Sequence, residues 1–151
     1  EATSWFGPLP LTQDYFIDVK SLDSGEIDYA LDIVIPPLAN SGASGKICYP
    51  SEMIPAMTVY FEDTMNGLIT QVPIAEGQST YEVTLEPGTY LAYAWLPDFT
   101  LGGLYSYAVP CGLSVDCTDH DPIVVQIYPN QTTNDIDICD WYLDPANIPL
   151  P

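Results

Sequence analysis

The sequence predicts an all-β protein whose strands form an antiparallel sandwich. Its 151 residues are enough for one domain with a sizeable core. Fifteen prolines are scattered along the chain and leave few stretches long enough for a helix, because an interior proline costs a helix about 3 kcal/mol. Short runs rich in β-branched and aromatic residues alternate with turn sequences. About seven or eight such strands within about 100 residues are typical of a sandwich.

The expected strands lie between residues 47 and 142. They span 47–50, 57–61, 68–74, 81–85, 90–96, 104–109, 123–128 and 136–142. Turn-forming pairs separate them at Asn66-Gly67, Glu76-Gly77, Pro87-Gly88, Gly102-Gly103 and Pro129-Asn130. We therefore expect the sandwich domain over residues 46–143.

The segment from Leu85 to Ala94 carries the most specific local motif. Its sequence, Leu-Glu-Pro-Gly-Thr-Tyr-Leu-Ala-Tyr-Ala, resembles the L-x-P-G-x-Y-x-x-x-A hairpin of prealbumin-like modules, which include carboxypeptidase regulatory-like and Cna-B-like domains. Pro87 presets φ for a turn, Gly88 can adopt a positive φ, and Tyr90 begins a strand whose alternate side chains face the core. The resemblance covers roughly residues 45–142 and implies an immunoglobulin-like (prealbumin-like) sandwich in a secreted or cell-surface protein. Such modules serve as spacers, stalks, fibre units and binders.

An N-terminal arm is expected over residues 1–38, joined to the sandwich by a Gly/Ser linker at 39–45. Within the arm, residues 26–35 alternate between two faces. The apolar face carries Ile27, Tyr29, Leu31, Ile33 and Ile35, and the other face carries Glu26, Asp28, Ala30, Asp32 and Val34. Burying each large apolar side chain stabilises by about 1.5–3 kcal/mol, so this face requires a partner.

Two hypotheses for that partner stay open. The strand completes its own sandwich, or it is donated to an exposed sheet edge of a neighbouring subunit, as in the arms of donor-strand filament subunits. We favour donation. The apolar, proline-punctuated segments at 5–11 and in the C-terminal tail, 144–151, are likewise expected to be held by neighbouring molecules.

Four cysteines form an even set without CxxC spacing, which argues against zinc-ribbon and thioredoxin sites. Cys111 and Cys117 are close enough to close a short loop, which leaves Cys48 in the first expected strand to pair with Cys139 in the last. Three pairings exist for four cysteines, and buried thiols remain an alternative. Two disulfides together with the scarcity of lysine favour an oxidising, extracellular setting.

The charge of the chain excludes two classes of partner. It carries 21 Asp+Glu against 2 Lys+Arg, a formal net charge of -19. No basic patch can be assembled to bind nucleic acid phosphates or anionic lipid headgroups. No stretch approaches the roughly 18 consecutive apolar residues that would indicate a membrane span.

Little in the sequence indicates catalysis. His120 is the only histidine, and it lies in an acidic segment with Asp116, Asp119 and Asp121. One histidine is poor support for zinc, and the spacing does not match a calcium-binding loop, so we expect a solvated acidic turn, with a calcium site as the weaker alternative. No nucleophile elbow or phosphate-binding loop is present. We therefore expect no enzyme activity and no cofactor.

Asn130 begins an Asn-Gln-Thr sequon in an expected turn and is a candidate for a covalent glycan. Taken together, these features favour a non-enzymatic extracellular structural subunit that forms a homopolymer, a head-to-tail filament built by strand donation. The alternative is a monomeric secreted β-sandwich that binds carbohydrate or calcium. The clustering of tyrosine and tryptophan in the expected strands is the feature that favours carbohydrate.

Overall fold

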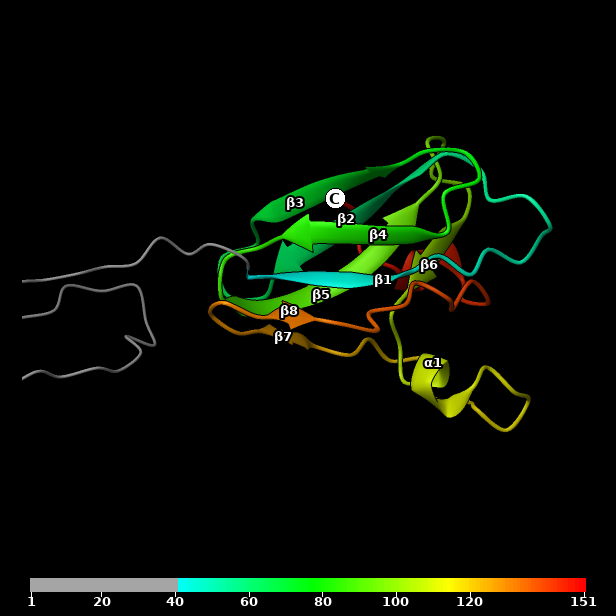
Figure 1. Cartoon of the computed structure of the whole chain (residues 1–151). Coiled ribbons are helices and arrows are strands. Elements are labelled where there is room, and N and C mark those ends of the chain that lie inside the picture. Colours follow the sequence, from blue (N-terminus) through cyan, green and yellow to red (C-terminus); the bar gives the residue numbers. More distant parts are fainter. Residues whose placement is uncertain (1–40) are drawn as a thin grey trace, which may run out of the picture. The chain divides into compact units, whose positions relative to one another are not determined.

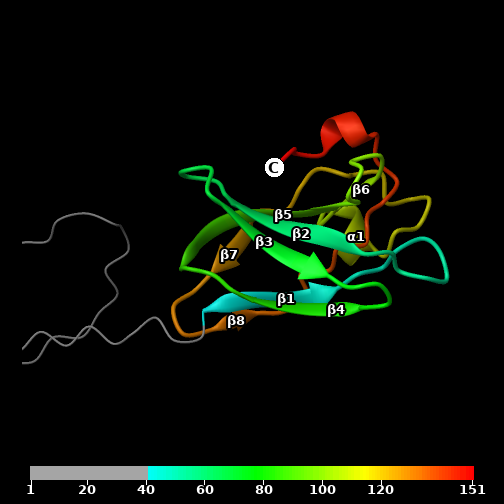
Figure 2. The same ribbon diagram turned by 90° about the horizontal axis from the view of Figure 1, so that it is seen from above.

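Two β-sheets lie face to face in the computed structural model, which describes residues 41–151 (Figure 1). The three-stranded sheet has the order β4-β1-β8. It consists of β1 (Gly42–Lys46), β4 (Thr80–Thr84) and β8 (Thr132–Thr133). The five-stranded sheet has the order β3-β2-β5-β6, and β7 pairs with β5 as well. It consists of β2 (Met57–Asp63), β3 (Ile69–Ile74), β5 (Gly88–Trp95), β6 (Gly102–Leu104) and β7 (Val125–Ile127). Figure 2 shows the two layers from above.

The prediction of an all-β sandwich is confirmed. Every strand pair is antiparallel except β1 and β8, which run parallel. The only helical segments in the described part are α1 (Ala108–Cys111) and a 3-10 turn, η1 (Pro145–Asn147). Five expected strands are confirmed with small shifts at their ends, and they are β2, β3, β4, β5 and β7.

Two expected strands are absent from the fold. The segment 104–109 leaves β6 and turns into α1, which ends at Gly112 in the left-handed conformation with φ 100°. The segment 136–142 forms single bridges instead of a strand, because it crosses between the sheets: Ile138 pairs with Ile47, and Asp140 pairs with Leu104.

The predicted Gly/Ser linker was wrong for residues 42–45, because they form β1 at the centre of the three-stranded sheet. The expected strand at 47–50 was therefore placed a few residues too late. Two glycines explain this strand. A Cβ on Gly42 would overlap the carbonyl group of Val83, and one on Gly45 would overlap the carbonyl group of Ile136. The small residues of β1 let backbones approach closely on both sides, a use of glycine that composition alone does not separate from flexibility.

The motif around Pro87 and Gly88 is a crossover between sheets, and the prediction of a hairpin was wrong. β4 pairs with β1, whereas β5 pairs with β2, β6 and β7. Gly88 is not among the glycines with positive φ. The expected core position of Tyr90 is confirmed, and its hydroxyl donates to the backbone oxygen of Glu86 at 2.9 Å. This bond returns from the new strand to the connection and fixes the corner, as the tyrosine corner does in other sandwiches.

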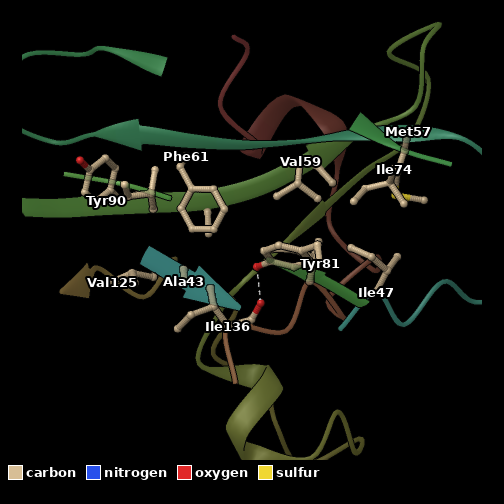
Figure 3. Close-up of a cluster of buried hydrophobic side chains, with 14 of the residues drawn as sticks. Ala43, Ile47, Met57, Val59, Phe61, Ile74, Tyr81, Tyr90, Val125 and Ile136 are labelled. Atoms are coloured by element: carbon tan, nitrogen blue, oxygen red, sulfur yellow. Dashed lines mark hydrogen bonds between the residues drawn. The ribbon is translucent and has the colours of Figure 1, made fainter. Parts of the chain in front are cut away.

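The main core fills the space between the sheets (Figure 3). Val59 and Phe61 of β2 face Ala43 of β1 and Tyr81 of β4, and all four are buried. Tyr81 lies opposite Gly45 in the register, where no side chain blocks it, and its hydroxyl donates to the backbone oxygen of Ile136. The Tyr81 ring thus covers Gly45, and its hydrogen bond joins β4 to the segment after β8, on the other side of β1.

A second cluster covers the outer face of the five-stranded sheet. Tyr93 and Trp95 of β5 pack there with Tyr60, Leu104 and Ile148. Trp95 Nε1 donates to the backbone oxygen of Pro149 at 2.7 Å. Ile148 and Pro149 therefore pack on their own sheet, and the prediction that neighbouring molecules hold this tail was wrong for these two residues. The reason is that the outer face of β5 is itself apolar and needs a cover.

Candidate functional site

The structure contains both disulfides, with the pairing that the sequence predicted. Cys48–Cys139 joins the segment after β1 to the segment that follows β8, across 91 residues of sequence, with the Cα atoms 4.5 Å apart. Cys111–Cys117 closes the loop after α1, with the Cα atoms 5.8 Å apart. No cysteine is free. The Cys48–Cys139 bond joins the beginning and the end of the sandwich. The Cys111–Cys117 bond restricts the loop that leaves the sandwich after α1.

A buried carboxylate lies where the chain passes from one sheet to the other. Asp140 is fully buried, and its backbone exchanges hydrogen bonds with Leu104 at the end of β6. Its Oδ2 accepts a hydrogen bond from the Ser106 hydroxyl at 2.5 Å and lies 2.7 Å from His120 Nδ1. A buried charge is costly unless it is paired and hydrogen-bonded, and Ser106 and His120 together meet that requirement.

His120 connects this buried carboxylate to the surface. Its side chain is 34% exposed and borders a shallow hollow. The hollow is lined further by Thr118, Asp119, Asp121, Pro122, Leu143 and Asn147. An ionised carboxylate only accepts hydrogen bonds, so Asp140 holds the imidazole with Nδ1 as donor and directs Nε2 away from the pair. Asp116, Asp119 and Asp121 are exposed, as expected for a solvated acidic turn. His120 departs from that expectation, because its ring is held by the buried Asp140.

This arrangement orients an imidazole but does not form a nucleophilic relay. Ser106 donates to the same carboxylate oxygen that His120 contacts. Within residues 41–151, no hydroxyl or thiol hydrogen-bonds to the ring of His120. A relay needs the nucleophile on the other ring nitrogen. The geometry thus serves to satisfy Asp140 and to fasten the loop that contains the Cys111–Cys117 bond.

Sequence reasoning missed Asp140, although a signal was present. In the run from Ile136 to Trp141, Asp140 has the same parity as Ile136 and Ile138, and all three are buried. A carboxylate on the apolar face of an alternating segment needs a partner. The only histidine was the obvious candidate.

The weak calcium prediction is not supported by the placement of its residues. Asp116, Asp119 and Asp121 are exposed, and Asp119 Oδ1 instead accepts the backbone N–H of Asp121 at 3.0 Å. In the part of the chain that the structure describes, no group of three or more His, Cys, Asp or Glu side chains could hold a metal ion.

Asn130 lies exposed in the turn between β7 and β8, with φ 57°. Its backbone N–H donates to the Ser41 hydroxyl at 2.9 Å, which leaves the carboxamide at the surface. The site is accessible to a glycan, and its glycosylation stays a prediction. The expected donor residues Ile27, Tyr29, Leu31, Ile33 and Ile35 lie outside the described residues.

The comparisons with known proteins identify no relative of this chain. No protein-family model matches the chain, nor does any curated protein or any solved structure. Among residues 41–151, no helix is both long and apolar enough to cross a membrane. The all-β sandwich with its two disulfides is thus the class that the residues themselves define.

Proposed function

We propose that this protein is a non-enzymatic extracellular structural subunit that assembles head-to-tail into a filament by strand donation. The observation that carries the proposal is the inequality of the two sheets. A three-stranded sheet faces a five-stranded one, so the smaller sheet has room for a further strand at its edge. The segment 26–35, with five large apolar residues on one face, has the pattern of such a strand.

Energetics favour a donated strand that stays bound. Five apolar side chains at about 1.5–3 kcal/mol each give a gross stabilisation of roughly 7–15 kcal/mol before ordering costs. This is comparable to the whole stability of an ordinary domain, about 5–15 kcal/mol. Because donor and acceptor lie on different parts of the chain, the contact is heterologous, and its repetition produces a filament.

The prealbumin-like form of the sandwich is part of the proposal. In immunoglobulin constant domains the first two strands belong to one sheet. Here β1 belongs to the three-stranded sheet and β2 to the five-stranded sheet. The sheet assignment of β1 and β2 therefore differs from that of an immunoglobulin constant domain. The Tyr90 corner at the Leu85–Ala94 motif supports the resemblance to prealbumin-like modules.

An extracellular location agrees with three features of the chain. Both disulfides are of the kind that persists in oxidising compartments. Asn130 offers an exposed sequon, and the net charge of -19 would keep filaments apart from one another at low salt.

Size-exclusion chromatography with light scattering, together with electron microscopy of the full chain, tests the proposal. The wild-type protein should form polymers. The double variant Leu31→Asp/Ile33→Asp should remain monomeric, because it places charges on the apolar face of the arm. The matched control Ala30→Asp/Val34→Asp adds the same charge to the opposite face and should still polymerise once added salt screens that charge, whereas Leu31→Asp/Ile33→Asp should stay monomeric at the same salt concentration. A wild-type chain that stays monomeric at every concentration contradicts the proposal, as does polymerisation of both variants.

A further inference from the structure

The outer edge of β4 carries backbone groups that no described residue uses. Leu85 N donates to Ser41 O and Ile47 N donates to Ser79 O, which shows that the odd-numbered residues of this strand bond to β1. In an antiparallel pair the intervening residues face the other way. Glu82 and Thr84 therefore direct their N–H and C=O groups outward, and no partner for these groups lies within residues 41–151.

The edge of β3 is protected against strand addition. Asp63 N donates to Leu68 O, so the even-numbered residues of β3 bond to β2 and the odd-numbered ones face outward. One of the outward residues is Pro73. Proline has no N–H to offer, and proteins place it on edge strands for this reason.

The two short strands beside β5 are closed by neighbouring segments. The outward backbone of Leu104 in β6 exchanges hydrogen bonds with Asp140, at 2.9 and 3.2 Å. The outward carbonyl of Gln126 in β7 accepts the Thr133 hydroxyl at 2.9 Å. Each strand is only three residues long, so neither offers a ladder to a further strand.

The segment that runs parallel to β1, residues 131–139, is kinked and pairs irregularly with β1. Asp135 has φ 61°, which interrupts the extended backbone. Asp137 turns its carboxylate onto the backbone N–H of Lys46 at 2.8 Å, in place of a ladder bond. Kinks and charges of this kind keep an edge from pairing. The Thr80 carbonyl of β4 accepts the Gln78 side-chain amide at 2.9 Å, and the outer edge is open at Glu82 and Thr84. Within the described sandwich, β4 is thus the regular edge strand that best offers a ladder to a further strand.

We propose that the β4 edge is the acceptor, and that its occupant is the segment 26–35 of a second copy of this chain. This inference rests on the proposed function and names the surface that it requires. In the extended ladder the apolar face of the donor continues the inner face of β4, beside Tyr81, Val83 and Leu85, which are buried or half-buried. The polar face of the donor continues the outer face, where Glu82 is exposed.

For a donor strand that pairs antiparallel with β4, chain length favours a second copy over the same molecule. Only six residues, 36–41, connect the end of the donor segment to β1. They span about 20 Å when fully extended. Antiparallel pairing of the same molecule's segment would require them to bridge two strand spacings and the length of β4, about 17 Å, which leaves almost no slack. A second copy has no such constraint.

The charges predict how assembly responds to salt. Glu82 would lie beside a donor face that carries Glu26, Asp28 and Asp32. Like charges on adjacent strands repel, and salt screens exposed charges. The polymer fraction should rise with added sodium chloride, and Glu82→Gln should reduce the salt that is needed.

A proline at the acceptor edge tests the assignment. Glu82→Pro removes an outward N–H without removing a bond to β1, and Gln71→Pro makes the matching change on the edge of β3. Light scattering should show that Glu82→Pro lowers the polymer fraction about tenfold or more while Gln71→Pro polymerises as the wild type does. Thermal unfolding of both variants checks that the sandwich still folds.

Hydrogen exchange on the wild-type chain provides a measurement that does not depend on a variant. The Glu82 and Thr84 amides should be protected at polymerising concentrations and should exchange freely in the Leu31→Asp/Ile33→Asp monomer. Polymerisation of a folded Glu82→Pro variant overturns the edge assignment and leaves the proposed function intact. Protection that does not depend on concentration overturns the second copy, because the occupant is then the same molecule's arm. A wild-type chain that never polymerises refutes the proposed function itself.

Discussion

Replacing Gly45 by alanine asks whether residues 42–45 are a linker or a strand. In a solvent-exposed linker this change is neutral or slightly stabilising, because alanine restricts the unfolded chain. In the fold described above, Gly45 lies in the central strand of the three-stranded sheet. The new Cβ would overlap the Ile136 carbonyl oxygen and lie 2.5 Å from its carbon.

The loss of stability in Gly45→Ala can be worked out from the hydrogen bonds that the Ile136 backbone would lose. Its N–H donates to Ser44 O at 3.0 Å, and its oxygen accepts the Tyr81 hydroxyl. Moving this segment away strains or breaks both bonds, at about 1 kcal/mol each, and overpacking adds about 1–3 kcal/mol. We expect Gly45→Ala to lower the free energy of unfolding by about 3–5 kcal/mol.

Urea or guanidinium denaturation followed by tryptophan fluorescence measures this change. Gly88→Ala is the matched control, because the atoms nearest to a Cβ there belong to the Tyr90 side chain, at 3.4 Å or more, and φ is not positive. The control should shift stability by less than about 1 kcal/mol. If Gly45→Ala is as mild as Gly88→Ala, the placement of β1 between its two neighbours is refuted.

Three further changes test other parts of the fold. Burial raises the pKa of Tyr81 above its ordinary range. The contribution of this shift to stability is therefore complete below about pH 10 and is lost as the pH rises further. Tyr81→Phe should flatten the alkaline limb of a curve of unfolding free energy against pH. Cys48→Ser/Cys139→Ser opens a bond that spans 91 residues and should lower the free energy of unfolding by about 4–5 kcal/mol in denaturant titrations, whereas a loss below about 1 kcal/mol would contradict that closure. His120→Ala leaves the buried Asp140 carboxylate with one partner fewer and should cost about 1–3 kcal/mol by calorimetry, an effect that the exposed Thr118→Ala control should not show.

Local patterns predicted most of the strands and turns. Gly67 and Gly77 have φ of 71° and 77°, as the Asn66-Gly67 and Glu76-Gly77 turns require. Alternation and β-branched content placed β2 to β5 within a few residues of their ends. These features depend on neighbours in sequence, which is why they can be read without knowledge of the fold.

Other features depend on contacts between residues far apart in the chain. The glycines of β1 read as flexible until the neighbours on both sides are known. Asp140 reads as an ordinary acidic residue until His120 and Ser106 are placed beside it. In the same way, the sequence predicts that neighbouring molecules hold the C-terminal tail, whereas the structure shows Trp95 of the same molecule bonded to Pro149.

The amino-acid sequence by itself predicted the all-β fold class and favoured the disulfide pairing that the structure contains. The strand at 26–35 stays a prediction from the sequence. Tertiary structure decided which turn joins two sheets, which carboxylate is buried, and which sheet edges are closed. The physical reason is that strand propensity and turn geometry are local. Sheet order, by contrast, arises from backbone groups that meet only when distant segments pack. Whether an edge can then accept another strand depends on single residues, such as Pro73 in β3 and Asp135 with its positive φ.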